Sequence, residues 1–321
     1  MRMSLIALGL MAVLLFAPAY AEETEESFEG WQVSADLGLN FTQSAYSNSW
    51  DGSEESSINW TFTGNMVAET YLRETLNWRN TLKLTFGQTH TEERRTVGDK
   101  AERSWAKPQK SSDRIFLESL LRADFGYYVD PYAALTVETQ FYNTFVPGED
   151  AIAAGGEEIT YYLDPMTLTE SAGVGRKFIT REELELYSRL GFAVRQHFFR
   201  RIVSFVPEET ESETETDGGL EWVTDYAHTF ADGEMKYVSK LRIFQALFYS
   251  ESDRYDGTAL EDSDVADYWK SPDVAWENTL SASVSKYIQV SLFFELLYDK
   301  EVDLRGRFRE ILGLGVAYKL F

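Results

Sequence analysis

The sequence predicts an all-β protein, a single antiparallel transmembrane β-barrel of about twelve strands with short turns at one end and longer loops at the other. Three observations lead to this prediction. Apolar and polar residues alternate along many segments, beginning with residues 31–41, where every odd position from Trp31 to Phe41 is apolar. The apolar phase is nearly free of charge, although 26% of the chain is charged. Aromatic residues make up 15% of the chain and gather at the ends of the segments.

A period of two indicates a strand with one apolar and one polar face. In the segment 113–128 the apolar face continues through Phe125 and Tyr127. The segment 165–178 fits least well, because Glu170 and Arg176 interrupt its apolar face. Besides 31–41, the predicted strands are 58–68, 76–86, 113–128, 132–145, 165–178, 184–198, 220–230, 237–249, 274–284, 288–298 and 308–321.

The connections between these segments alternate in length. Short ones carry turn residues, as at Asp130-Pro131 and at 231–234. Bacterial barrels have short periplasmic turns and longer outer loops, so both termini are expected on the periplasmic side. Trp and Tyr near both strand ends fit two interfacial girdles. The predicted long polar loops are 43–57, 88–112, 146–164, 199–218 and 250–272, and the connection 299–307 is of moderate length.

The first residues have the pattern of a cleaved export signal. Arg2 precedes an apolar run from Leu5 to Phe16, and Ala19-Tyr20-Ala21 fits a cleavage site. We therefore expect a signal peptide at 1–21 and one outer-membrane barrel domain at 22–321. A retained N-terminal anchor is the alternative. The later chain has no apolar run of about 18 residues, so no spanning helix is predicted.

Composition excludes some classes of partner and site. The chain has 53 acidic and 30 basic residues, a net charge of −23, which argues against nucleic acid as a partner. It has no cysteine, so disulfides and Cys-metal sites are excluded. A soluble periplasmic β-sandwich has the same period with its apolar face inward, and it stays open as an alternative. The aromatic girdles and the alternating loop lengths favour the membrane barrel, in which a lipid-facing basic charge costs about 2–4 kcal/mol at the midplane.

The polar phase carries both signs of charge and is predicted to face the lumen. Opposite charges there are expected to pair between strands. Apolar residues share this phase, so a plugged lumen and an open pore both stay open; they are Phe116, Leu120, Phe244, Phe248, Phe293 and Leu297. The predicted lumen-lining residues are Glu69, Arg79, Lys83, Glu118, Arg122, Glu138, Glu185, Arg189, Arg195, Glu221, Lys240, Arg242, Glu277 and Glu295.

Several short motifs carry a family resemblance. They are Gly38–Ser44, Asn48-Ser49-Trp50, Asn77–Leu82, Thr85–Gln88, Lys110–Ile115, Thr139–Phe141, Glu170–Gly175 and Leu296–Asp299. With them the chain resembles a family of outer-membrane barrels classed as a domain of unknown function. In such families Asn and Trp are often adjacent, whereas Ser49 separates them here. The resemblance implies fold and location, and it implies no activity.

The C-terminal segment 313–321 resembles the last strand that the barrel-assembly machinery recognises. Phe321 is out of phase with the apolar residues that precede it, such as Leu314 and Tyr318. A bulge or a turned-out last residue would reconcile the two phases.

The candidates for chemistry are few. The histidines are His90, His197 and His228, and Ser188 lies too far from His197 along its strand to form a dyad. No catalytic residue is therefore predicted. The acidic runs 208–217 and 251–267 contain ligands suited to Ca²⁺ or Mg²⁺, but solvated loops are the favoured interpretation, so no metal or cofactor is predicted.

These observations predict a non-enzymatic integral outer-membrane barrel, either a narrow pore or small-solute transporter or a structural surface protein. The alternative is an outer-membrane lipid-modifying hydrolase of deacylase or phospholipase type. The expected partners are outer-membrane lipid, lipopolysaccharide and, during insertion, the barrel-assembly machinery. The sequence leaves the oligomeric state open.

Overall fold

The computed structural model describes residues 30–46, 55–97, 100–145, 158–181, 183–205, 208–261, 263–285 and 288–319. The predicted signal peptide and Phe321 lie outside these residues. The strands are β1 Gln32–Ser44, β2 Ser57–Arg73, β3 Leu76–Val97, β4 Lys100–Trp105, β5 Gln109–Ala123, β6 Asp130–Thr139, β7 Thr144–Phe145, β8 Glu158–Thr160, β9 Met166–Arg181, β10 Leu184–Phe205, β11 Glu208–Phe230, β12 Met235–Tyr249, β13 Asp273–Ser283, β14 Ile288–Asp299 and β15 Asp303–Lys319, and η1 Asp264–Lys270 is a 3₁₀-helix.

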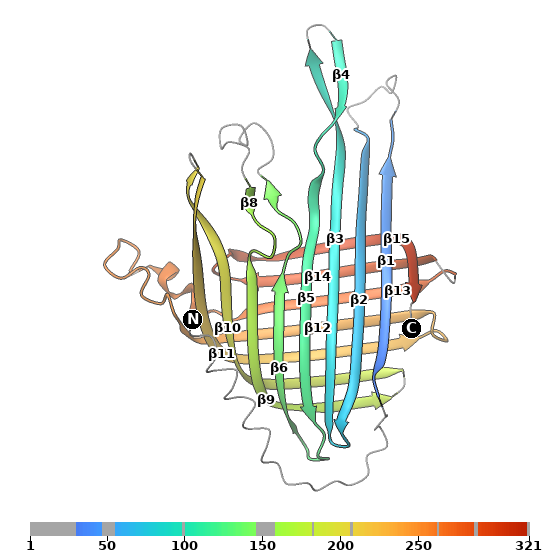
Figure 1. The fold of residues 1–321 in the computed structure, drawn as a ribbon, viewed down its shortest axis with the longest axis vertical. Helices are drawn as coiled ribbons and strands as arrows, with labels where there is room; N and C mark the ends of the chain where they lie inside the picture. The colour runs from blue at the N-terminus through green and yellow to red at the C-terminus, as the bar shows by residue number, and fades with distance from the viewer. Residues whose placement is uncertain are drawn as a thin grey trace.

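The strands form a closed antiparallel ring (Figure 1). Twelve of them follow one another in chain order around the ring, and β15 pairs with β1 to close it. β4 pairs only with the upper part of β3, and β7 and β8 make a separate hairpin. The predicted fold class, a single barrel of about twelve strands, is therefore confirmed.

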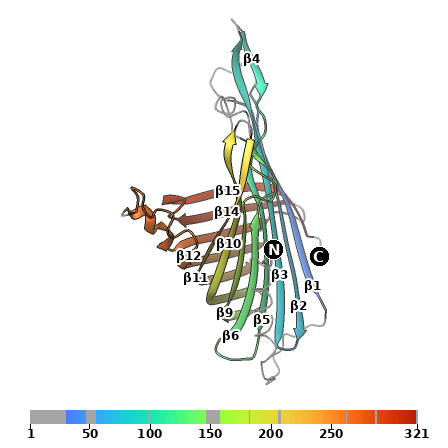
Figure 2. The same ribbon diagram turned by 60° about the vertical axis from the view of Figure 1, so that its left-hand side comes forward.

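The two walls of the barrel cross at a steep angle. In Figure 1 the strands β1 to β6 lie roughly vertical in front, while β12 to β15 run across the view behind them. Figure 2 shows the same two walls from the side, with the β3–β4 hairpin projecting beyond them. Strands that tilt strongly against a barrel axis produce this crossing. Side chains from the two walls consequently meet inside the ring.

The apolar phase faces outward. Leu39, Phe41 and Leu190 are exposed on the outer surface, and 68% of Leu312 is exposed. Apolar side chains that point into the ring are buried instead, and Phe116 is 1% exposed. A soluble sandwich would bury the apolar phase between two layers, so this alternative is wrong. A broad exposed apolar band is the surface that a lipid bilayer covers.

Aromatic pairs lie toward both ends of the wall. Trp31 and Trp78 meet edge to face with ring centroids 5.3 Å apart near the β2–β3 turn. Trp60 and Phe86 lie toward the other end of the same strands, with centroids 5.7 Å apart. Two separated aromatic levels are typical of the interfacial girdles of membrane barrels.

The predicted short turn at 231–234 is confirmed. Ala231, Asp232 and Gly233 have φ values of 55°, 55° and 87°, and the Glu234 N–H donates to the Ala231 carbonyl at 3.0 Å. This left-handed stretch is the local geometry that reverses the chain between β11 and β12.

Two of the predicted long loops are mostly strand. The segment 88–112 continues β3 and forms β4 and the start of β5, and the segment 199–218 extends β10 and β11. The register of β10 and β11 runs as far as Phe205 opposite Glu208. A hairpin beyond the membrane needs backbone pairing but no apolar face, so hydrophobic periodicity does not detect it. The prediction of 250–272 as irregular chain holds around η1.

Two side-chain predictions were also wrong. Phe125 and Tyr127 belong to the connection 124–129, because β5 ends at Ala123. Phe248 does not face the lumen: a register shift opposite Gly218 and Gly219 changes the phase of β12, and Phe248 stacks outside on Phe192 with ring centroids 6.4 Å apart. A β-bulge reverses the inside–outside alternation beyond it.

No helix in the described ranges is long and apolar enough to cross a membrane.

Candidate functional site

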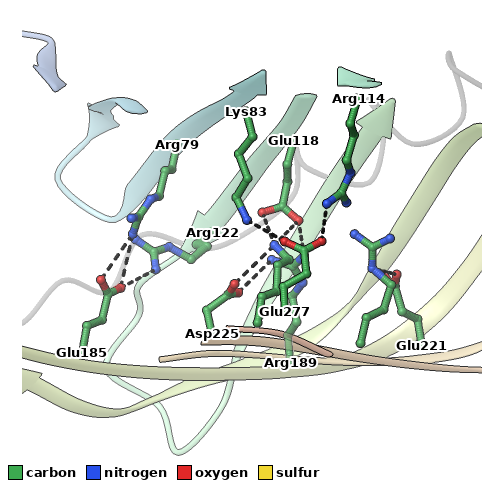
Figure 3. A network of polar contacts seen from close by, with 12 residues as sticks. Arg79, Lys83, Arg114, Glu118, Arg122, Glu185, Arg189, Glu221, Asp225 and Glu277 are labelled. Atoms are coloured by element: carbon green, nitrogen blue, oxygen red, sulfur yellow. Dashed lines mark hydrogen bonds and ion pairs between the residues drawn. The ribbon is translucent and has the colours of Figure 1, made fainter. Parts of the chain in front are cut away.

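A belt of paired charges crosses the lumen. Every residue predicted to line the lumen takes part in an ion pair, and Arg114, Asp225 and Arg309 join them. Figure 3 shows how side chains from one wall point toward those of the other. The belt consists of Glu69, Arg79, Lys83, Arg114, Glu118, Arg122, Glu138, Glu185, Arg189, Glu221, Asp225, Lys240, Arg242, Glu277, Glu295 and Arg309. The remaining predicted residue, Arg195, pairs with Asp217 and Asp273 instead.

Several belt contacts connect opposite strands of the ring. Arg114 on β5 lies 2.6 Å from Glu277 on β13, and five strands separate β5 from β13 in either direction. Lys83 on β3 reaches the other carboxylate oxygen of Glu277 at 3.0 Å. These contacts require the side chains to span the lumen. The belt therefore links the two walls directly.

Glu118 is a buried carboxylate at the centre of the belt. It is 5% exposed and accepts hydrogen bonds from Arg189 Nη2 at 2.5 Å and from Lys240 Nζ at 2.9 Å. Asp225 lies 3.2 Å from Lys240 and 3.9 Å from Arg189 on the far wall. Buried charges are tolerated when each has opposite charges and hydrogen bonds around it. The arrangement around Glu118 meets this condition.

Arginines and lysines also surround the buried ring of Phe116. The cationic groups of Lys83, Arg114, Lys240 and Arg242 lie 5.5, 5.1, 5.5 and 5.8 Å from its centroid. Cations at this distance from an aromatic ring are attracted to its π face. The ring and the belt together fill the middle of the barrel in this conformation.

Two belt arginines were not predicted from the sequence. Both residues lie inside predicted strands, Arg114 in 113–128 and Arg309 in 308–321, and both have the inward phase. The period of two within these segments was the signal that could have found them. Asp225 has the same inward phase on β11.

A cavity of about 490 Å³ lies beside the belt on the side of the long connections. Its charged lining is largely paired: Arg114 contacts Glu138 at 2.8 Å, Arg309 contacts Glu295 at 2.8 Å, and Lys110 contacts Asp113 at 3.0 Å. We call this cavity the outer vestibule. It is lined by Asp113, Arg114, Glu138, Thr139, Gln140, Pro165, Thr167, Glu295, Leu297, Arg307, Phe308 and Arg309.

His197 makes a hydroxyl–imidazole–carboxylate chain at the edge of the vestibule. Its Nδ1 lies 3.1 Å from Thr167 Oγ1, and its Nε2 lies 3.8 Å from Asp217 Oδ2. The sequence analysis missed Thr167 because this residue is on the neighbouring strand β9. Ser188 is elsewhere, hydrogen-bonded to Thr224 at 2.9 Å, and His228 lies 3.4 Å from the hydroxyl of Tyr226. His90 is opposite Ile58 in the ladder of β2 and β3.

The acidic runs do not form a metal centre in the part of the chain that the structure describes. No group of three His, Asp or Glu side chains there is arranged to hold a metal ion. The residues of 211–217 lie on β11, and Asp217 is bound by the guanidinium of Arg195 at 2.9 Å. This carboxylate therefore neutralises an arginine of the lumen.

The fold is similar in outline to solved bacterial membrane barrels. The translocator domain of the autotransporter NalP from Neisseria meningitidis is 9% identical with a TM-score of 0.38, over 92% of this chain and 90% of that chain. The COG4313 outer membrane channel from Pseudomonas putida F1 is 12% identical with a TM-score of 0.35, over 95% of this chain and 99% of that chain. Scores at this level carry no conclusion about function.

A search of curated proteins finds no match to the sequence. A family model with the description "Protein of unknown function (DUF3078)" matches residues 41–145. This range contains most of the motifs that carry the resemblance, while those at 170–175 and 296–299 lie beyond it. The resemblance to a family of unknown function is thus confirmed over residues 41–145, which run from the end of β1 to β7 of this twelve-stranded barrel.

Proposed function

We propose that the protein is a non-enzymatic outer-membrane barrel that carries small solutes through a narrow lumen, and that the belt closes this lumen at rest. The observation that supports the proposal is the contact of Arg114 with Glu277 across the full width of the ring. The exposed apolar band supports a position in a lipid bilayer. The signal-like first residues support export to the outer membrane.

Ion pairs between side chains can close the lumen reversibly. Several belt cations have more than one acidic neighbour, as Arg114 has Glu138, Glu277 and Glu295. A charged solute that offers equivalent contacts competes with these pairs, because a buried ion pair gains little over a well-matched replacement. A lumen closed in this way excludes ions at rest and admits a solute that exchanges partners with the belt.

Conductance in planar lipid bilayers tests the closure. The wild-type barrel should show rare or very small openings, and Arg114→Ala should raise the open fraction at least tenfold because it removes contacts to both walls. Arg305→Ala is the matched control, since Arg305 is exposed and contacts only Asp303 in the described structure.

A permanently silent barrel in all these variants would instead identify a structural surface protein. A wild-type barrel with a stable high conductance would contradict the closing role of the belt. Because Arg114→Ala leaves Glu277 with one cation fewer, insertion of each variant is checked by heat-modifiable migration before recording.

The second candidate function is a lipid-modifying hydrolase, which the chain Thr167–His197–Asp217 favours. A hydroxyl hydrogen-bonded to an imidazole, with a carboxylate on the far nitrogen, is the arrangement that activates a nucleophile. Comparison of lipid A and phospholipid profiles in cells with Thr167→Ala, His197→Ala or His228→Ala tests it. A hydrolase predicts that the first two variants lose a product and that His228→Ala keeps it. Unchanged lipids in all three exclude this function.

A further inference from the structure

The outer vestibule has charged side chains on both walls of the barrel. Part of its lining belongs to β5 and β6 in the front wall of Figure 1, and part belongs to β14 and β15 in the wall behind. The described lining contains equal numbers of acidic and basic residues, so a solute without net charge meets no net repulsion there. They are Asp113, Glu138 and Glu295 on the acidic side and Arg114, Arg307 and Arg309 on the basic side.

Four of these charges form a chain of alternating sign between the walls. Glu138 contacts Arg114 Nε at 2.8 Å, and Arg114 Nη1 lies 3.9 Å from Glu295. Glu295 in turn contacts Arg309 Nη2 at 2.8 Å. The side chains at the two ends are the accessible ones, since Glu138 is 38% exposed and Arg309 is 37% exposed, against 9% for Glu295. One wall thus offers a solute a carboxylate, and the other offers a guanidinium.

The two exposed ends lie at different levels along β5. Arg309 Nη1 donates to Ser112 Oγ at 3.3 Å, whereas Glu138 contacts Arg114, which is two residues farther along the strand. Two residues of a strand cover about 7 Å. The ammonium and carboxylate groups of an extended dipeptide or tripeptide are about 7–10 Å apart. Those of a single α-amino acid are joined through one carbon atom, so a short peptide fits this spacing better.

Both ends can bind a further group and keep their present partners. A guanidinium has five N–H donors, so a carboxylate can share Arg309 with Glu295. A carboxylate has about four lone-pair sites, so Glu138 can bind an ammonium group while it keeps Arg114. A ligand with a single charge gains only one of these contacts and adds a net charge to a neutral lining. The geometry therefore favours a ligand that carries both charges.

The rest of the vestibule suits a peptide backbone with small side chains. Its volume of about 490 Å³ is within the range of small-molecule sites, about 300–1,000 Å³. Thr139, Gln140 and Thr167 contribute polar groups to the lining, and Pro165 and Leu297 contribute apolar surface.

We infer that the outer vestibule binds a zwitterionic peptide of two or three residues, with its ammonium group at Glu138 and its carboxylate at Arg309. The inference names a class of solute for the proposed passage through the lumen, and in this respect it rests on the proposed function. Binding in the vestibule can nevertheless be measured separately from transport.

Isothermal titration calorimetry of the full chain tests the site. The barrel is held in phosphatidylglycerol nanodiscs, which contain no zwitterionic head group, and the probe is trialanine at pH 7. N-acetyl-trialanine lacks the ammonium group, and trialanine amide lacks the carboxylate. Each should bind at least tenfold less tightly than trialanine. Alanine and glycerophosphoethanolamine carry both charges at a shorter spacing, and each should also bind at least tenfold less tightly.

Two variants assign the ends of the peptide to the two walls. Glu138→Gln should weaken trialanine binding at least tenfold and change the binding of N-acetyl-trialanine less than twofold, because that ligand has no ammonium group. Arg309→Gln should weaken trialanine binding at least tenfold and change the binding of trialanine amide less than twofold. Arg305→Ala is the matched control and should leave all affinities unchanged, since Arg305 is exposed and contacts Asp303. Insertion of each variant is checked by heat-modifiable migration, and the capped ligands test the wild type without any substitution.

Equal binding of trialanine and its capped forms would overturn the inference, as would binding that neither Glu138→Gln nor Arg309→Gln weakens. Tighter binding of glycerophosphoethanolamine than of trialanine would also overturn it and would identify a lipid head group instead. Uptake of radiolabelled trialanine into proteoliposomes separates the inference from the proposed function. Binding without uptake supports the peptide site and contradicts passage through the lumen. Absence of binding, with the conductance of Arg114→Ala raised as proposed, overturns the peptide site alone.

Discussion

The belt and the β1–β15 junction hold the barrel together in opposite ways. In the belt, side chains connect strands that are far apart in the ring, as Arg114 and Glu277 do at 2.6 Å. At the junction, the described residues of the two neighbouring strands share five residue pairs. The barrel is thus braced across its interior and weakly closed along one line of its wall. The difference predicts that contacts across the lumen contribute more to stability than the described pairs of this one junction.

The largest effect on the free energy of unfolding is expected from replacing Glu118, the carboxylate at the centre of the belt. Glu118→Ala leaves Arg189 and Lys240 buried without their main acceptor, and breaking such a buried pair costs about 3–5 kcal/mol of unfolding free energy. Urea unfolding in phospholipid vesicles, followed by tryptophan fluorescence, measures the loss. Glu310→Ala is the matched control, because Glu310 is exposed on the outer face. Equal stability of the two variants would show that the belt does not brace the barrel.

A covalent bond across the junction of β1 and β15 should have the next largest effect on the free energy of unfolding. A disulfide between Leu39→Cys and Val316→Cys joins directly paired positions of β1 and β15. It should raise the unfolding free energy by about 2–4 kcal/mol, because it closes a loop of nearly the whole barrel. The same bridge between Leu190→Cys and Trp222→Cys, which pair in the long ladder of β10 and β11, should add less. Oxidised and reduced samples of each pair give the comparison.

A smaller effect on the free energy of unfolding is expected from replacing an acidic residue on the outer face of the barrel. Glu170 is opposite Leu135 and Val194, while its neighbours Thr169 and Ser171 are buried, so Glu170 faces outward within the apolar band. An acidic group on the lipid face costs less than a basic one, so Glu170→Leu should add about 1 kcal/mol to the unfolding free energy. Glu170→Gln should give part of this gain. A loss of stability in Glu170→Leu would indicate that a partner binds this carboxylate.

The smallest expected effect concerns the connection between β14 and β15. Partial desolvation, together with the carboxylates of Asp299 and Asp273, raises the pKa of Glu301 to about 7. A carboxyl group whose pKa is raised on folding favours the folded connection when protonated. This contribution is complete below the ordinary pKa of Glu and is lost as the pH rises through about 7.

Carbon-13 NMR of the Glu301 carboxyl group measures this titration. The midpoint should lie near pH 7 and should fall in Asp299→Asn, because one of the repelling charges is removed. Amide exchange at 300–302 should become faster between pH 5 and pH 8 in the wild type, after correction for intrinsic exchange. Glu301→Gln should remove this pH dependence. A midpoint near the ordinary value for Glu would contradict the prediction.

The sequence by itself determined the fold class, the strand number and the phase of most strands. A strand with water or packed charge on one side and lipid on the other must alternate, so Leu37, Leu39 and Phe41 could be assigned to the outside from their spacing alone. The same period placed Lys83, Glu118 and Glu277 on the lumen side. This assignment was possible because the alternation within one strand decides which face of the wall each side chain is on, whatever strands lie beside it.

Only the tertiary structure decided what the inward residues do and where the wall is weak. The tilt and stagger of the strands decide which inward side chains meet. Examples are the contacts of Lys83 with Glu277 and of Thr167 with His197. The bulge that turns Phe248 outward and the extension of β10 and β11 beyond the apolar band left no hydrophobic signal. The five-pair junction also depends on the complete ring, because closure sums the offsets of every strand pair before β15 meets β1.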